Sequence, residues 1–146
     1  GKMIDGTFPV WQRVLPAEAP ALGCVEADDL LAAIATVLTA SETKDNRLWM
    51  EAAGGRLHLA SAGNLKDAST SVRWDGDGFV AGMNGKYLAD IIRPFEGGLA
   101  YLERPGDDQT VMIATGGGAS LRTAAMPMRA IRPVNMDDLI AAGQSA

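Results

Sequence analysis

Two amphipathic helical segments, each followed by a run of short strands, constrain the fold of this chain more than any other feature. The first helix begins at Asp28-Asp29, and the second begins at Asn84, a residue suited to an N-cap. In both segments apolar residues recur every three to four positions and so form one buried face. Proline and paired glycines follow the second helix, which we expect to end near Arg93. The two buried faces comprise Leu30, Leu31, Ile34, Val37 and Leu38, and then Tyr87, Leu88, Ile91 and Ile92.

The segments after each helix alternate apolar and polar residues, which is the pattern of half-buried strands. Gly54-Gly55 predicts one hairpin, and Asp75-Gly76-Asp77-Gly78 predicts a second. Because the strands come in runs, the pattern favours an antiparallel α+β fold over a parallel α/β fold. The order of a helix with strands, repeated once, indicates an internal pseudo-duplication. The expected strands cover 47–51, 57–59, 69–74, 79–80, 99–103, 111–113 and 119–125.

The pattern divides the chain into three regions. Residues 1–20 contain three prolines and are expected to be a strand end and a linker outside the main core. Residues 21–130 form one domain of ordinary size. Residues 131–146 form a tail, which we expect to be disordered apart from a short helical candidate at 137–142.

Composition limits the partners and the compartment. Hydrophobic residues make up 47% of the chain, enough for a sizeable core. A net charge of -5 repels nucleic acid unless a basic stripe or a topological link holds the two together. One cysteine excludes an internal disulfide and fits the cytoplasm, where we expect this protein. No apolar run reaches the roughly 18 residues of a membrane span, so no membrane partner is expected.

No group of residues predicts catalysis. His58, the single histidine, lies within a strand and is interpreted as solvated or structural. Cys24 is interpreted as buried and inert, with an activated thiolate as the alternative. Gly116-Gly117-Gly118 is a turn and lacks the Lys-Ser/Thr of a phosphate-binding loop. We therefore expect no catalytic residue, no metal site, no cofactor and no enzyme activity.

Met126-Pro127-Met128-Arg129 follows the last strand directly. Methionine side chains are flexible and polarizable, which suits an adaptable partner-binding surface. The residues alone leave two interpretations open, partner binding and simple strand termination.

Three motifs together resemble bacterial DNA sliding clamps, the beta subunit of DNA polymerase III. Gly6 to Pro16, reading GTFPVWQRVLP, is similar to the segment that leaves the middle clamp domain, and Lys2 to Asp5 resembles that domain's last strand. Met83 to Leu88 is similar to the start of a helix in the family, and Ala125 to Arg129 resembles its chain terminus. The motifs occur in the family's order and at its spacing, so the chain is identified as a C-terminal clamp domain with the end of the middle domain.

The resemblance implies a DNA-clamp fold with two helices packed on two antiparallel sheets. It also implies a homodimeric ring of such domains that encircles double-stranded DNA and gives the replicative polymerase its processivity. Polymerase, clamp-loader and repair proteins would insert short linear peptides into a groove. Lys86 and Arg93 would face the DNA. The implied peptide-binding residues are Pro9, Arg13, Val14, Asn84, Tyr87, Met126, Pro127, Met128 and Arg129.

Some features depart from the family. The chain continues past Arg129, and its tail is a candidate competitor for the groove. The first helix carries no Lys or Arg before Lys44, and Ala124-Ala125 are small for groove-lining residues. We expect a fragment of a longer clamp rather than a truncated homologue. The alternative function is a clamp-fold protein-interaction adaptor that does not itself encircle DNA.

Overall fold

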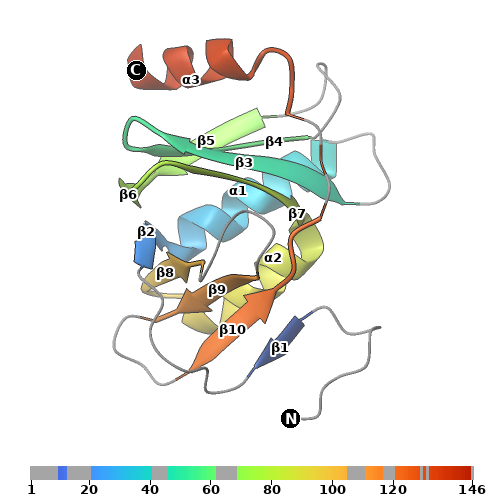
Figure 1. Ribbon diagram of the computed structural model, residues 1–146, viewed down its shortest axis with the longest axis vertical. Helices are drawn as coiled ribbons and strands as arrows, with labels where there is room; N and C mark the ends of the chain where they lie inside the picture. The colour runs from blue at the N-terminus through green and yellow to red at the C-terminus, as the bar shows by residue number, and fades with distance from the viewer. Residues whose placement is uncertain are drawn as a thin grey trace.

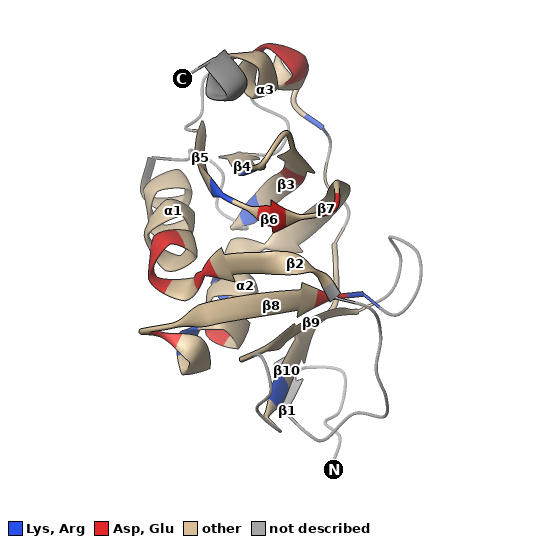
Figure 2. Ribbon diagram, turned by 90° about the vertical axis from the view of Figure 1, so that its left-hand side faces the viewer, with Lys and Arg blue, Asp and Glu red and all other residues tan. Residues whose placement is uncertain are grey.

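The computed structural model describes residues 10–12, 21–40, 46–61, 69–104, 111–116, 121–128, 130 and 132–145. Two antiparallel sheets lie side by side, and helices α1 and α2 cover one side of them (Figures 1 and 2). The elements are β1 (Val10–Gln12), β2 (Ala21–Glu26), α1 (Ala27–Ala40), β3 (Arg47–Ala53), β4 (Arg56–Ser61), β5 (Ser69–Arg73), β6 (Asp75–Gly76), β7 (Phe79–Asn84), α2 (Gly85–Ile92), the 3-10 helix η1 (Arg93–Phe95), β8 (Leu99–Glu103), β9 (Met112–Thr115), β10 (Arg122–Ala125) and α3 (Met136–Ser145).

The sheets confirm the α+β class and show how the two halves of the fold combine. One sheet has the order β1-β10-β9-β8-β2-β6, and the other has the order β5-β4-β3-β7. Each half supplies one strand, one helix and a three-stranded meander. The leading strand of each half pairs with the meander of the other half, because β2 pairs with β8 and β7 pairs with β3. The halves are therefore interlocked and share one core.

Two strand predictions were incomplete or wrong. Strand β2, directly before α1, was not predicted. The hairpin expected at 75–78 does not exist, because β5 and β7 form opposite edges of the four-stranded sheet. Asp75–Gly76 instead pairs with Gly23 and Cys24 in the other sheet. The Asp-Gly repeat is a local turn signal, whereas this pairing depends on residues about fifty positions away.

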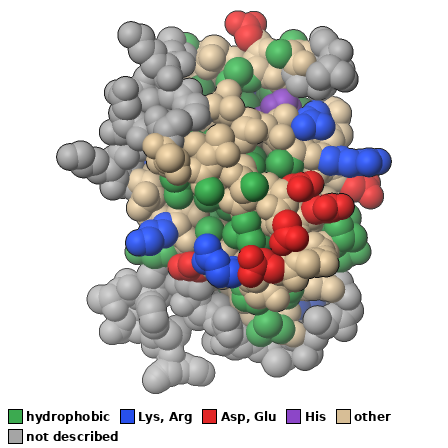
Figure 3. All heavy atoms as spheres, turned by 180° about the vertical axis from the view of Figure 1, so that it is seen from behind, with side chains coloured by type: hydrophobic (Ala, Val, Ile, Leu, Met, Phe, Trp, Pro, Cys, Tyr) green, Lys and Arg blue, Asp and Glu red, His purple; other side chains and the backbone are tan. Residues whose placement is uncertain are grey.

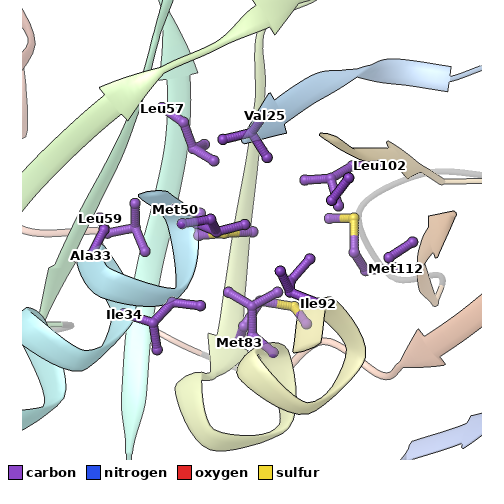
Figure 4. Close-up of a cluster of buried hydrophobic side chains, with 14 of the residues drawn as sticks. Val25, Ala33, Ile34, Met50, Leu57, Leu59, Met83, Ile92, Leu102 and Met112 are labelled. Atoms are coloured by element: carbon purple, nitrogen blue, oxygen red, sulfur yellow. The ribbon is translucent and has the colours of Figure 1, made fainter. Parts of the chain in front are cut away.

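The core lies between the helices and the two sheets. Leu30, Ile34 and Val37 of α1 and Leu88 and Ile91 of α2 are fully buried, as their spacing predicted. Both sheets contribute methionine or leucine to the same cluster (Figure 4). The core side chains labelled there come from six strands and both helices, and they are Val25, Ala33, Ile34, Met50, Leu57, Leu59, Met83, Ile92, Leu102 and Met112.

Both ends of the chain add to the expected domain. Strand β1 falls within the predicted linker, yet it pairs with β10 at the edge of the six-stranded sheet. The expectation of a disordered tail is wrong for its described part, because residues Met136–Ser145 form helix α3. Met136 is fully buried, so this helix packs on the domain through an apolar anchor. The predicted boundaries at residues 20 and 130 remain a prediction.

Candidate partner-binding site

Residues Met126, Pro127 and Met128, which we call the Met-Pro-Met segment, directly follow β10. This strand lies between β1 and β9, and Ala125 is paired with Val10 of β1. Ala124 and Ala125 are fully buried, whereas Met126 is 50% exposed. The two alanines therefore belong to the core, and the first solvent-accessible apolar side chain after the strand is a methionine.

A backbone hydrogen bond fixes the far end of this segment. The amide of Met128 donates to the carbonyl oxygen of Gly82 in β7 over 2.9 Å. Strand β7 ends at Asn84, where α2 begins. The Met-Pro-Met segment thus runs from the end of β10, inside the six-stranded sheet, to β7 at the edge of the four-stranded sheet, close to the start of α2.

Helix α2 is held in place by contacts with the same strands. It packs against β10, β9, β7 and β1. The buried hydroxyl of Thr123 in β10 donates to the carbonyl oxygen of Ile91 over 2.7 Å. Because Ile91 lies in the last turn of α2, this bond satisfies a carbonyl that has no partner within the helix.

Asn84 has a structural function at this site. Its Oδ1 accepts hydrogen bonds from the amides of Lys86 and Tyr87 at 2.9 and 3.1 Å. This arrangement caps the first turn of α2, as the sequence predicted. Tyr87 is half-buried and packs against the core. Both residues therefore lie at the β7–α2 junction, close in sequence to Gly82, which contacts Met128.

The structure describes five of the nine predicted peptide-binding residues. Met126, Pro127 and Met128 follow β10, and Asn84 and Tyr87 lie at the β7–α2 junction, on the C-terminal side of Gly82, which accepts the hydrogen bond from Met128. That these five form one peptide site stays a prediction. Pro9, Arg13, Val14 and Arg129 lie outside the described residues, so their place in the site stays a prediction. Sequence reasoning missed Gly82 and Thr123. A glycine within an apolar strand is the signal for Gly82, since it often marks close approach of another backbone.

The helical side of the molecule carries mixed charge. Lys86 and Arg93 are exposed, but the Arg93 guanidinium pairs with Asp90 at 3.0 Å. Helix α1 carries the exposed carboxylates Asp28 and Asp29 and no basic residue (Figure 2). Seen from this side, the described surface shows acidic side chains among basic ones and no continuous basic stripe (Figure 3).

The two residues considered for chemistry are poor candidates for it. His58 is 3% exposed, so the solvated alternative is wrong. Burial lowers the pKa of His58, and the Arg56 charge lowers it further against the opposing effect of Glu51. Cys24 is half-buried in β2, where burial and then the Asp75 charge raise its thiol pKa. A raised pKa disfavours the thiolate that nucleophilic chemistry requires.

Other site types were sought among the residues that the structure describes. In that part of the chain, no group of three or more His, Cys, Asp or Glu side chains is placed to hold a metal ion. None of its helices has the length and apolar character needed to cross a membrane.

The two sheets with helices on one side have the sliding-clamp fold. The TM-score is 0.68 against a beta sliding clamp from Caulobacter crescentus, at 23% sequence identity, and 0.67 against a clamp from Pseudomonas aeruginosa, at 22%. Each comparison covers 88% of this chain and about a third (34% and 35%) of the other.

By sequence, the chain is similar to bacterial beta sliding clamps in particular. It is 26% identical over 132 residues to the beta sliding clamp of Caulobacter vibrioides and 24% identical over 131 residues to that of Pseudomonas putida. These matches confirm the resemblance found in the sequence motifs. The chain spans 35% and 36% of the length of these relatives. No protein-family model matches it.

Proposed function

We propose that this chain is the C-terminal domain of a processivity clamp, a protein that tethers the replicative DNA polymerase and other replication or repair proteins to DNA. The similarity to beta sliding clamps over 88% of the chain carries the proposal. In the assembled protein, such domains would form a homodimeric ring around double-stranded DNA. The function is a binding function in the cytoplasm, and it requires no catalytic residue or cofactor.

The proposed peptide site is the Met-Pro-Met segment together with the start of α2. A half-exposed methionine beside buried alanines offers an apolar surface next to a rigid sheet. Apolar anchors of a short peptide gain most of their binding energy at such surfaces. Asn84 and Tyr87 would border the site, and Pro9, Arg13, Val14 and Arg129 would complete it.

Titration of this chain against a fluorescein-labelled peptide with two large apolar anchors tests the proposed site. This chain spans only 35% of the length of its relative, so the groove would lack the part contributed by the rest of a clamp. We therefore expect weak but saturable binding, with a Kd on the order of 100 μM. Met126→Ala should weaken binding by about threefold or more. Leu99→Ala is the matched control, because Leu99 is also a large exposed apolar residue but lies on β8. Equal losses in both variants would contradict the site.

One observation favours a second function, that of a clamp-fold adaptor that does not encircle DNA. Helix α1 has no lysine or arginine, and its first turn is acidic. Such a helix gives no Coulombic attraction to a phosphate backbone. The distinguishing experiment loads the full-length protein onto circular DNA and measures how much protein stays bound before and after the DNA is linearised. Release on linearisation supports a topological clamp, and failure to be retained supports the adaptor.

A further inference from the structure

Met128, the last residue of the Met-Pro-Met segment, and Ala130, two positions further on, lie directly against Gly82 of strand β7. A Cβ atom added at Gly82 would be 2.5 Å from the carbonyl oxygen of Met128 and 2.7 Å from the Cβ of Ala130. Both distances are shorter than van der Waals contact. The glycine at position 82 therefore allows two backbones to touch, and the hydrogen bond from Met128 to Gly82 closes the same contact.

Arg132 then fastens the chain to strand β3. Its Nε and Nη2 donate to the two carboxylate oxygens of Glu51 over 2.8 and 3.0 Å, a bidentate pair. Trp49 Nε1 donates to Glu51 over 2.8 Å, and Arg132 Nη2 also donates to Asp137 over 2.7 Å. The Glu51 side chain is only 14% exposed, so this pair is better shielded than an ordinary surface ion pair.

Helix α3 covers the face of the four-stranded sheet that points away from α1. Leu57 and Leu59 of β4 face the core, yet His58 and Ala60, which point the other way, are also buried. Helix α3 contacts β4, and Met136 is fully buried there. In Figure 1, α3 lies at one end of the molecule and β1 at the other. The helix is therefore remote from the strand that pairs with β10.

We propose that Arg132 and α3, together called the C-terminal anchor, position the Met-Pro-Met segment for peptide binding. The segment is held at one end by β10 and at the other by the contact with Gly82, which the anchor maintains. Met126 stays half-exposed, so the anchor orders the segment without covering it. The anchor is a positioning device rather than the competitor for the groove that the sequence suggested. The effect on peptides rests on the proposed function, but the ordering of the segment does not.

Amide hydrogen exchange measured by NMR on the whole chain tests the anchor. In Arg132→Ala, exchange of the Met128 amide should rise about tenfold, while that of Leu102 in the core stays within twofold of the wild type. Arg132→Lys keeps the charge but loses the bidentate geometry, and it should give an intermediate rise. Unchanged exchange at Met128, or an equal rise at Met128 and Leu102, would overturn the proposal.

Peptide titration of the same variants separates an anchor from a competitor. An anchor predicts that Arg132→Ala binds the labelled peptide about threefold more weakly than the wild type. Tighter binding would mean that the C-terminal residues compete for the groove, and it would overturn the proposal. If the wild-type chain binds no peptide, the proposed function fails. In that case the amide exchange of Met128 alone tests whether the anchor orders the Met-Pro-Met segment.

Discussion

Asn84 shows how one residue serves both the fold and the proposed site. Its Oδ1 caps α2 through two backbone amides, and it lies at the end of the strand that contacts Met128. The N-cap was predictable, because Asn before an amphipathic stripe is a local signal. The contact at Gly82 was not predictable in detail, since a glycine does not indicate which distant backbone approaches it.

Asn84→Ala should destabilise the chain by about 1 kcal/mol, because two amides at the start of α2 lose their acceptor. Urea unfolding followed by circular dichroism measures this change. Asn84→Ser keeps a capping oxygen and should recover most of the stability. If Ser also restores peptide affinity, Asn84 acts through the cap. If only stability returns, Asn84 contacts the peptide.

Gly82→Ala should destabilise the chain by about 1 to 3 kcal/mol, because the new methyl group overlaps the backbone of Met128. The free energy of unfolding in urea is the measurement. Gly98→Ala is the control, since the nearest heavy atom to its added Cβ is the Phe95 carbonyl oxygen at 4.0 Å. Losses of equal size at the two positions would show that the close contact at Gly82 is unimportant.

At the scale of elements, β10 is the strand that contacts most of the other elements around the proposed site. It pairs with β1 and β9, contacts α2 and leads into the Met-Pro-Met segment. The alternation of 119–125 predicted a strand there, and the structure confirms it as Arg122–Ala125. Its neighbours in the sheet could not be predicted, because strand order depends on contacts between residues far apart in the sequence.

Thr123→Val should cost about 1 to 3 kcal/mol, because the buried carbonyl of Ile91 loses its donor. We expect a local effect as well, with faster amide exchange in the last turn of α2. Thr123→Ser retains the hydroxyl and should cost less than the valine variant. A valine variant as stable as the wild type would mean that the hydrogen bond does not hold α2 to β10.

At the scale of the whole molecule, the C-terminal anchor joins a tail to the four-stranded sheet through the half-buried carboxylate of Glu51 and the buried side chain of Met136. Burial raises the pKa of Glu51, but hydrogen bonds from Arg132 and Trp49 outweigh this effect, and the pKa falls below its ordinary value of 4.5. The folded state therefore favours ionised Glu51. Its contribution to stability is complete above pH 4.5 and is lost as the pH falls through the lowered pKa.

Glu51→Gln should lower the free energy of unfolding by about 1 to 2 kcal/mol at pH 7, because Arg132 loses its ionised partner. The difference from the wild type should shrink below pH 4.5, where Glu51 becomes protonated in both the unfolded and, finally, the folded state. Urea unfolding at pH 7, 5 and 3.5 measures it. A difference that stays constant over this range would contradict the role of the ionised carboxylate.

The isolated chain should bind duplex DNA too weakly to saturate at physiological salt, because its net charge is -5 and the described α1 surface is acidic. Fluorescence anisotropy with a labelled duplex is the measurement. Tight binding that weakens steeply with added salt would show a basic contact surface that the described residues do not provide.

The sequence by itself determined the two helices, most strands, the α+β class and the resemblance to sliding clamps, because periodicity, caps and short motifs are local. Only the tertiary structure decided that β6 leaves the expected hairpin to pair with β2, and that α3 packs on the outer face of the four-stranded sheet. Both outcomes depend on complementary surfaces formed by distant residues. The Arg132–Glu51 pair was likewise decided only by the tertiary structure, since its partners are 81 residues apart and no local pattern relates them.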